Sequence, residues 1–392
     1  MISNALVIEE GSTRNTVPVV RSLGRKNICV THATENGRKT PASLSKYVTK
    51  RIPYTLNNSF QDVFVKEIIE YLEKDKYDII IPVGDKPTEI ISKYKDILSE
   101  YTSVPVPDFE NFIQARDKAQ TLKKAINIGI PCPITYFEEV KGVKEIPTAI
   151  KFPLIIKPCS SSGSIGISYV ATPKDFMTKY TETKQMFGIP LVQEYIPSGG
   201  AGYGVSMLFN KGEPIASFTH KRLREYPISG GPSTLRESVN FHEIETHAMK
   251  ILKSLNWHGV AMVEFKIDPR DNTPKLMEIN PRFWGSLPLA IHAGVDFPYL
   301  LYKICVDKNI KPVFNYRIGA RARWLSGDIL WLLSYPKKIE AITEFFKLEK
   351  DTCFDMLSFD DPLPAIGEII FGILFLINKD RILQTFDKGI KR

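Results

Sequence analysis

The chain has few cysteines, and none of them forms a recognisable metal-binding or disulfide pattern. Its 392 residues include 5 cysteines, widely spaced and without a CxxC pair. This spacing argues against the common zinc motifs and a disulfide framework, and it is typical of a protein from a reducing compartment. The N-terminus also lacks the charged and apolar regions of a signal peptide. We therefore expect a cytoplasmic protein.

Long apolar runs and blocks of like charge are also missing. The longest apolar stretch, around Ile369 to Ile377, is too short to span a bilayer. The net charge is +8, yet the basic residues are scattered among acids and show no aromatic interleaving. We expect no nucleic-acid partner and no stable membrane insertion. The apolar and basic C-terminal segment leaves membrane-surface association open.

Several familiar catalytic and nucleotide-binding motifs are absent. No GxGxxG follows the first apolar run and no glycine-rich stretch ends in GK[ST], which argues against a dinucleotide fingerprint and a P-loop. His242 and His247 resemble a zincin motif, but they are five residues apart rather than four, so a helix would not direct both to one metal. The chemistry must come from other residues.

Apolar patterning divides the chain into three parts. In residues 1–108, apolar runs alternate with helical patterns, which predicts a small, mostly parallel α/β domain. Residues 109–316 form the second predicted domain, which opens with one amphipathic helix over Phe109–Ile128. A mostly helical extension is expected over residues 317–392.

One stretch, Ala261 to Ser286, has the strongest chemical signal. It predicts two short alternating strands joined by a turn rich in Pro, Asp and Asn. A simple hairpin sets Glu264 opposite Glu278, and Lys266 opposite Leu276. Two carboxylates that face each other at about 5 Å repel, so a sheet gains no stability from this pair.

A cation would convert this repulsion into coordination. Together with the amide oxygen of Asn280, Glu264 and Glu278 suit Mg²⁺, which completes its shell with water and substrate phosphates. A solvated polar face of the hairpin explains the same pattern. Both interpretations stay open at this point.

A lysine followed by a serine- and glycine-rich loop occurs earlier in the chain. Leu154 to Ile156 predicts a buried strand, and Lys157 at its end needs an anion or an exit to water. The small residues from Cys159 to Gly166 allow backbone N–H groups to approach a phosphate. A flexible loop at a strand end is the alternative.

Basic residues also gather at another predicted strand end. Lys221, Arg222 and Arg224 precede a glycine- and serine-rich loop. Such a cluster suits a transferring phosphoryl group or an anionic substrate. A solvated cluster is the ordinary alternative.

In chain order, these features resemble the ATP-grasp superfamily. The similarity covers about residues 109–307 and is closest to the carbamoyl-phosphate-synthase-like and biotin-carboxylase-like branch of carboxylate–amine ligases. It implies an α/β (α+β) fold, in which a pre-ATP-grasp domain precedes a two-lobed domain with mainly antiparallel sheets and a small lobe at about residues 130–195. The matching positions are Lys118, Lys157 with its loop, Gln193–Ile196, Glu264, Glu278, Asn280 and Arg282.

The resemblance implies a role for each position. Glu264, Glu278 and Asn280 would bind Mg²⁺, with two ions expected and Mn²⁺ as an alternative. The catalytic candidates are Arg282, Lys157, Arg222 and Arg224, with Arg282 holding the acyl phosphate or the substrate carboxylate. The ATP-binding candidates are Lys118, Lys157, Ser160, Ser161, Ser162, Gly163, Ser164, Ile165, Gln193, Glu194, Tyr195 and Ile196.

One departure from the family pattern concerns the ribose. The turn from Ser198 to Tyr203 has no acid where relatives often place one. Either Glu194 or backbone groups would then hold the ribose hydroxyls.

The implied activity is ATP-dependent amide formation through an acyl phosphate, with release of ADP and phosphate. The expected partners are a small carboxylic acid or amino acid and an amine, and a homodimer is compatible with the sequence. Two alternatives stay open: a bicarbonate-dependent carboxylase or carbamoyl-phosphate-type enzyme, and a non-catalytic ATP-binding regulatory protein.

Overall fold

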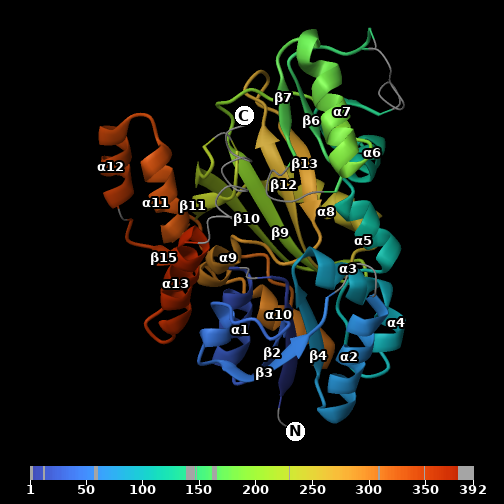
Figure 1. Cartoon of the computed structure of the whole chain (residues 1–392), viewed down its shortest axis with the longest axis vertical. Coiled ribbons are helices and arrows are strands. Elements are labelled where there is room, and N and C mark those ends of the chain that lie inside the picture. The colour runs from blue at the N-terminus through green and yellow to red at the C-terminus, as the bar shows by residue number, and fades with distance from the viewer. Residues whose placement is uncertain are drawn as a thin grey trace.

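The computed structural model describes residues 3–11, 14–56, 61–137, 146, 148–160, 166–228, 230–307, 310–347 and 349–377, with side chains to residue 373. These residues form three sheets with helices beside them. In Figure 1 the parallel sheet lies at the bottom, the large sheet in the middle and the small sheet with α7 at the top.

The N-terminal sheet is parallel, with strand order β3-β2-β1-β4. Its β1 and β4 are largely apolar runs buried along almost their whole length, as expected when helices cover both faces of a parallel sheet. The predicted parallel α/β unit is confirmed. Its elements are β1 (Asn4–Glu9), α1 (Thr16–Arg25), β2 (Cys29–Glu35), a 3₁₀ turn (Ala42–Leu44), β3 (Val48–Tyr54), α2 (Gln61–Lys74), β4 (Ile79–Val83), α3 (Asp85–Lys93) and α4 (Lys95–Leu98).

The helix predicted over Phe109–Ile128 is two helices, and this part of the prediction is wrong. Asp117 adopts an extended conformation that ends α5, and its side chain accepts a hydrogen bond from the backbone N–H of Gln120 at 2.9 Å. It therefore caps the next helix. The break places Lys118 at the first turn of α6, buried instead of solvated. The two helices are α5 (Phe109–Arg116) and α6 (Lys118–Asn127).

The small sheet is antiparallel, with strand order β5-β8-β6-β7. Its core contains Leu154, Ile156 and Val192, packed against Phe176 and Tyr180 of α7. Lys157 is the last residue of β6, at the edge of this core. The elements are β5 (Thr135–Tyr136), β6 (Leu154–Lys157), β7 (Ser168–Val170), a 3₁₀ turn (Pro173–Asp175), α7 (Phe176–Phe187) and β8 (Leu191–Glu194).

The large sheet has seven strands in the order β13-β12-β9-β10-β11-β14-β15, antiparallel except for the pair β14–β15. The mainly antiparallel sheets expected after the parallel one are confirmed. Its elements, with the helices that follow its strands, are β9 (Gly202–Asn210), β10 (Glu213–Glu225), β11 (Ser233–Ser238), α8 (His242–Ser254), β12 (Gly259–Ile267), β13 (Pro274–Asn280), α9 (Leu287–Ala293), α10 (Phe297–Val306), β14 (Arg321–Arg323) and β15 (Thr352–Phe354).

The hairpin β12–β13 has the predicted acid register but not the predicted lysine register. Glu264 pairs with Glu278, whereas Lys266 pairs with Lys275 instead of Leu276. The reason is a β-bulge next to Glu264, where one extra residue on β13 shifts the pairing.

One hydrophobic core joins the parallel sheet to the large sheet. It contains Val7 and Ile81 from the first, Phe218 from the second, and Trp284 and Phe297 from the segment that carries α9 and α10. Figure 1 shows α1 and α10 at this junction. The carboxyl ends of β1 and β4 are thereby held against the large sheet.

The C-terminal part contains α11 (Leu325–Ser334), α12 (Lys338–Phe346) and α13 (Leu363–Ile377). In Figure 1 they stand at one side of the molecule. Its strands β14 and β15 extend the large sheet, so hydrogen bonding runs across the predicted boundary at residue 316. The three-domain division itself stays a prediction.

Among the described residues, no single helix is both long and apolar enough to cross a bilayer. The bent pair α9 and α10 meets that test by length and composition only.

Candidate active site

Two carboxylates and an amide lie together on β12 and β13. Glu264 and Glu278 are cross-strand partners, and the Nδ2 of Asn280 donates to Glu264 Oε1 at 3.0 Å. The three side chains line the same cavity. The metal-binding candidates predicted from the sequence are therefore adjacent.

Basic side chains pair with both carboxylates. Arg222 Nη2 donates to Glu264 Oε2 at 2.5 Å, and Lys118 Nζ lies 3.2 Å from Glu278 Oε2. Burial raises the pKa of Glu264 and the charge of Glu278 adds to this, although Arg222 opposes it. Burial also acts to raise the pKa of Glu278, but Lys118 and Lys157 outweigh it, and the net shift is downward. The site is thus a mixed cluster of buried charges.

Lys118 and Lys157 come from different elements and meet at Glu278. The break between α5 and α6 positions Lys118, whose backbone N–H donates to the carbonyl of Cys159 at 2.9 Å. Lys157 is only 5% exposed, and burial lowers its pKa to about 8 despite the attraction of Glu278. An ammonium held so far from water gains most from an anionic ligand such as a phosphate.

The predicted phosphate loop is only partly described. Ser160 follows the end of β6 and is exposed, while Ser161, Ser162, Gly163, Ser164 and Ile165 lie outside the described residues. Gly166 closes the loop with φ of +76°, where a Cβ would also meet Pro158 and Phe187. The role of the loop stays a prediction.

The predicted hinge, Gln193 to Ile196, lies where β8 leads out of the small sheet. Gln193 Nε2 donates to Thr135 Oγ1 at 2.9 Å. The carbonyl of Ile196 accepts from Lys266 Nζ at 3.0 Å, and the ring of Tyr195 lies 5.8 Å from the same ammonium. Lys266 thus links the hinge to the large sheet.

The carboxylate of Glu194 is already engaged. Its Oε1 accepts from the backbone N–H of Ile134 at 2.8 Å, and its Oε2 accepts from Arg270 Nη2 at 2.7 Å. These contacts favour backbone groups over Glu194 for any contact with the ribose.

The arginine candidates separate into two groups. Arg222 and Arg282 line the cavity, and Arg282 Nε donates to Asp85 Oδ1 at 3.2 Å. Arg224 instead pairs with buried Asp328 at 2.8 Å and lies 4.5 Å from the ring of Trp331, in the C-terminal helices. The pairing of β10 with β11 is irregular on either side of Arg224, which accounts for the different direction of its side chain.

The cavity has a volume of about 300 Å³ and a mixed polar and apolar wall. Its lining comes from the N-terminal loop, β10, the β10–β11 loop, the acidic hairpin and the segment after it. The lining residues are Arg14, Asn15, His220, Arg222, Gly231, Pro232, Ser233, Met262, Glu264, Glu278, Asn280, Arg282, Trp284, Gly285 and Ser286.

Sequence reasoning missed the N-terminal contribution to this cavity. Arg14 and Asn15 follow β1, while Asp85, the partner of Arg282, follows β4. The strand order reverses between β1 and β4, so the connections after these two neighbours lead to opposite sides. Ligands of open α/β sheets bind at the carboxyl ends of such strands. The reversal of strand order is the signal that could have identified Arg14, and the sequence alone does not reveal the strand order.

A divalent cation fits the donor set of the hairpin. Within the described residues no group of three His, Cys, Asp or Glu side chains gathers as a complete metal site. Two carboxylates and an amide nevertheless suit Mg²⁺, which keeps waters and phosphate oxygens as its other ligands. Arg222 and Lys118 hold the same carboxylates in this structure, so a bound cation must compete with both.

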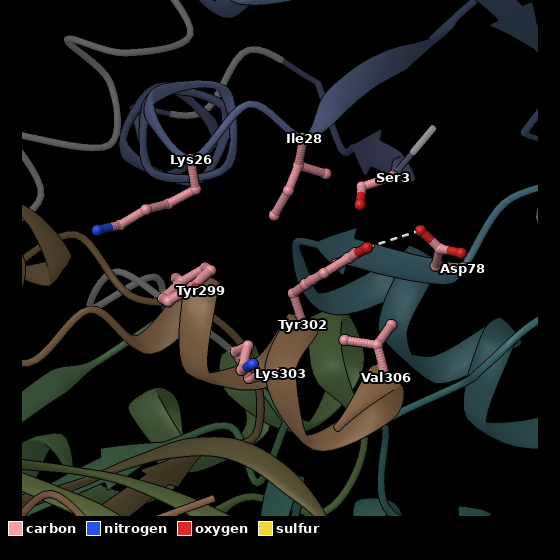
Figure 2. Close-up of a pocket in the computed structure, with 8 residues that line it drawn as sticks. All are labelled: Ser3, Lys26, Ile28, Asp78, Tyr299, Tyr302, Lys303 and Val306. Carbon is pink, nitrogen blue, oxygen red and sulfur yellow. Dashed lines mark hydrogen bonds between the residues drawn. The ribbon is translucent and has the colours of Figure 1, made fainter. Parts of the chain in front are cut away.

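A second cavity, of about 370 Å³, lies beside β1, β4 and α10 (Figure 2). Tyr302 Oη donates to Asp78 Oδ2 at 2.7 Å there, and Lys26 and Lys303 border the opening. None of the residues predicted for the site lines this cavity.

The sequence comparisons agree with the geometry. Residues 187–327 match the family model described as "ATP-grasp in the biosynthetic pathway with Ter operon". D-aspartate ligase of Enterococcus faecium is 25% identical over 300 residues, which is 69% of this chain and 70% of that protein. The large chain of carbamoyl phosphate synthase of Thermotoga petrophila is 21% identical over 269 residues, 65% of this chain but 24% of that protein.

The chain is similar to ATP-grasp proteins in sequence, most clearly over residues 187–327. A solved structure with the same fold is the biotin carboxylase domain of 2-oxoglutarate carboxylase from Hydrogenobacter thermophilus. It is 16% identical, with a TM-score of 0.65 and coverage of 82% of this chain and 73% of that one. The ATP-grasp fold and an ATP-grasp ligase, both expected from the sequence, are confirmed at the level of the family.

Proposed function

We propose that this ATP-grasp protein is a carboxylate–amine ligase, which forms an amide through an acyl phosphate and releases ADP and phosphate. The observation that supports this most is the register of Glu264 with Glu278, surrounded by Lys118, Lys157 and Arg222. Two facing acids destabilise a sheet, and the surrounding cations offset this repulsion in the absence of a bound metal ion. Phosphoryl transfer uses such an arrangement, because it needs charge neutralisation and positioning rather than a nucleophilic side chain.

ATP with Mg²⁺ would supply the phosphoryl group and a Lewis acid. Glu264, Glu278 and Asn280 would hold Mg²⁺, and we propose two ions, with Mn²⁺ as an alternative. Lys118 and Lys157 would bind the phosphates, together with the loop from Ser160 to Ile165. Gln193 to Ile196 would bind the adenine mainly through backbone groups.

Arg282 and Arg222 would act nearest the reacting carboxylate. Arg282 is fixed by Asp85 and by the carbonyl of Phe283, which accepts from Nη1 at 3.0 Å. A guanidinium held in this way can stabilise charge on the acid as it attacks the γ-phosphate. Arg224 is the weakest of the catalytic candidates, because its guanidinium pairs with Asp328.

The substrate acid and amine would enter the cavity beside the hairpin. D-aspartate ligase, by its name, uses an amino acid, and this favours amino acids or small carboxylic acids as substrates. A homodimer, the cytoplasmic location and membrane-surface association of the C-terminal segment stay predictions.

The decisive experiment is a phosphate-release screen of small acids and amino acids, singly and in pairs, with ATP and Mg²⁺. ADP formation that requires both an acid and an amine supports the ligase. Lys157→Ala and Glu278→Gln should abolish this turnover, while Glu213→Gln, an exposed change on β10, should leave it unchanged. Retained turnover in the first two variants would contradict the site.

A bicarbonate-dependent reaction is the second candidate. It is favoured by the similarity to carbamoyl phosphate synthase and by the solved biotin carboxylase domain, whose complex contains MgADP and bicarbonate. ADP formation that depends on bicarbonate without an added acid would select this candidate over the ligase.

A further inference from the structure

Three arginines lie close together beside the cavity: Arg14 and Arg222 line it, and Arg236 is fully buried next to them. Arg222 on β10 and Arg236 on β11 are cross-strand partners, and Arg14 reaches the same place from the loop after β1. Like charges set opposite each other destabilise a sheet. As with the two acids, this arrangement has an energetic cost that a ligand of opposite charge would offset.

One nearby carboxylate serves both Arg14 and Arg236. Asp355 Oδ1 accepts a hydrogen bond from Arg236 Nη2, and its Oδ2 lies 3.7 Å from Arg14 Nη1. Glu368 attracts Arg14 more weakly, and its carboxylate accepts from Trp324 Nε1. Arg222 is already balanced by Glu264 and Glu225.

Hydrogen-bond donors remain unused in this cluster. Within the described part of the chain, Nη1 of Arg14 and both Nε and Nη1 of Arg236 are buried without a hydrogen-bond partner. A buried guanidinium donor without an acceptor costs free energy, and most such groups in proteins are satisfied. Burial, together with the charge of Arg236, lowers the pKa of Arg14 to about 10 although Asp355 opposes it, so Arg14 is still a cation at neutral pH.

The fold holds the Arg14 guanidinium firmly in the cavity wall. It lies 3.9 Å from the centre of the Trp324 ring on one side. On another side is Gly285, where an added Cβ would stand 2.6 Å from Arg14 Nη2. A planar, stacked guanidinium suits a carboxylate, which accepts two parallel hydrogen bonds from it.

We propose that Arg14, supported by Arg236, binds a substrate carboxylate that is not activated and is retained in the product. This inference rests on the proposed ligase function and defines its substrate class. The activated carboxylate belongs beside Arg282 and the phosphates, so a second anion site in the same cavity requires a second anionic group. Either the amine is an amino acid with a free carboxylate, or the acid is a dicarboxylate.

The first test measures binding and needs no turnover. Trp284 lines the cavity and Trp324 lies on Arg14, so tryptophan fluorescence reports on this subsite. The protein with Mg²⁺ and a non-hydrolysable ATP analogue is titrated with alanine, aspartate and succinate, and with alaninamide, asparagine and succinamide. We expect at least one carboxylate to bind about 10- to 100-fold more tightly than its carboxamide. Equal binding within every pair, or no saturable change with any carboxylate, overturns the proposal.

Matched variants assign the preference to Arg14. Arg14→Gln should remove it, and Arg14→Lys should retain part of it. Gly285→Ala tests the geometry independently: the new methyl group would stand 2.6 Å from Arg14 Nη2 and displace the guanidinium while Arg14 is kept, so the preference should fall. Arg25→Gln, in an exposed pair with Asp360, is the control that should bind as the wild type does. An unchanged preference in folded Arg14→Gln contradicts the assignment.

Turnover measurements then show whether the amine or the acid supplies the retained carboxylate. They also distinguish the ligase proposal from the Arg14 subsite proposal. If the amine supplies it, amidating the amine substrate raises its KM; if the acid supplies it, replacing the dicarboxylate with its half-amide does so. An Arg14-dependent binding preference without ADP release contradicts the ligase but not the subsite. Ligation without any carboxylate preference contradicts the subsite alone.

Discussion

Asp361, which follows the last strand of the large sheet, pairs with Arg21 of the first helix in the interior of the protein. Arg21 Nε donates to Asp361 Oδ2 at 2.9 Å, and Ser45 Oγ donates to the same oxygen at 2.7 Å. Both charged side chains are at most 5% exposed. The segment that carries Asp355, the partner of Arg14 and Arg236, is therefore anchored on α1 and on the loop before β3.

Asp361→Ala should destabilise the protein by about 3–5 kcal/mol, because it leaves the buried Arg21 without its counter-charge. The measurement is urea unfolding at neutral pH. The neighbouring Asp360→Ala provides a matched control, since Asp360 pairs with Arg25 at the surface and such pairs contribute about 0–1 kcal/mol. Equal losses in the two variants would contradict the burial argument.

Binding of Mg²⁺ with ADP should raise the melting temperature of the wild type by mass action. Glu278→Gln should lose most of this rise, because one of the two carboxylates for the cation becomes an amide. Differential scanning fluorimetry with and without MgADP measures it. Glu213→Gln keeps the hairpin intact and should show the full shift; a full shift in Glu278→Gln as well would remove Glu278 from the metal site.

His258 should make the protein sensitive to acid. Its Nδ1 accepts from the backbone N–H of Lys211 at 3.2 Å, and burial, with Lys95 and Lys211 nearby, lowers its pKa to about 4. In the unfolded chain this histidine has an ordinary pKa near 6.5. Between pH 6.5 and 4 it is therefore largely protonated in the unfolded chain and neutral in the folded one. The contribution of His258 to the free energy of unfolding is therefore fully present above pH 6.5. It is lost, by up to about 3 kcal/mol, as the pH falls towards 4.

Comparing wild type with His258→Gln in urea at several pH values isolates this contribution. The variant should lose less stability between pH 6.5 and 4, although other groups titrate in both proteins. Parallel pH curves for the two proteins would show that His258 does not contribute.

Glu194→Gln should change the KM for ATP by less than about threefold. The carboxylate is held by Ile134 and Arg270, so we expect the nucleotide to contact the backbone of the hinge instead. Steady-state kinetics with ATP varied under saturating substrates measures this. A rise in the KM for ATP of about tenfold or more is the size expected for a lost charge-assisted hydrogen bond. It would show that Glu194 binds the ribose.

The acidic hairpin could be predicted from the sequence because its information is local. Alternation alone set Glu264 opposite Glu278, and the turn residues located the reversal. The same local reasoning failed at Lys266, since a bulge needs the neighbouring strand to reveal it. It failed at Asp117 too, where capping outweighed helical periodicity.

The far wall of the cavity could not be predicted from local patterns. Arg14 and Gly285 are separated by most of the chain, and their contact depends on the strand order of the parallel sheet and on its packing against the large one. Arg224 looked equivalent to Arg222 in sequence. Irregular pairing of β10 with β11 sends the two side chains to different neighbours.

The extension of the large sheet beyond residue 316 has a consequence for anyone who dissects this protein. Removing β14 would leave β11, Ser233–Ser238, as an open edge with unpaired backbone groups and mostly buried side chains now uncovered. Such an edge pairs readily with another chain. A fragment that ends at residue 316 should therefore self-associate, because the strand that covers this edge, β14, would be missing.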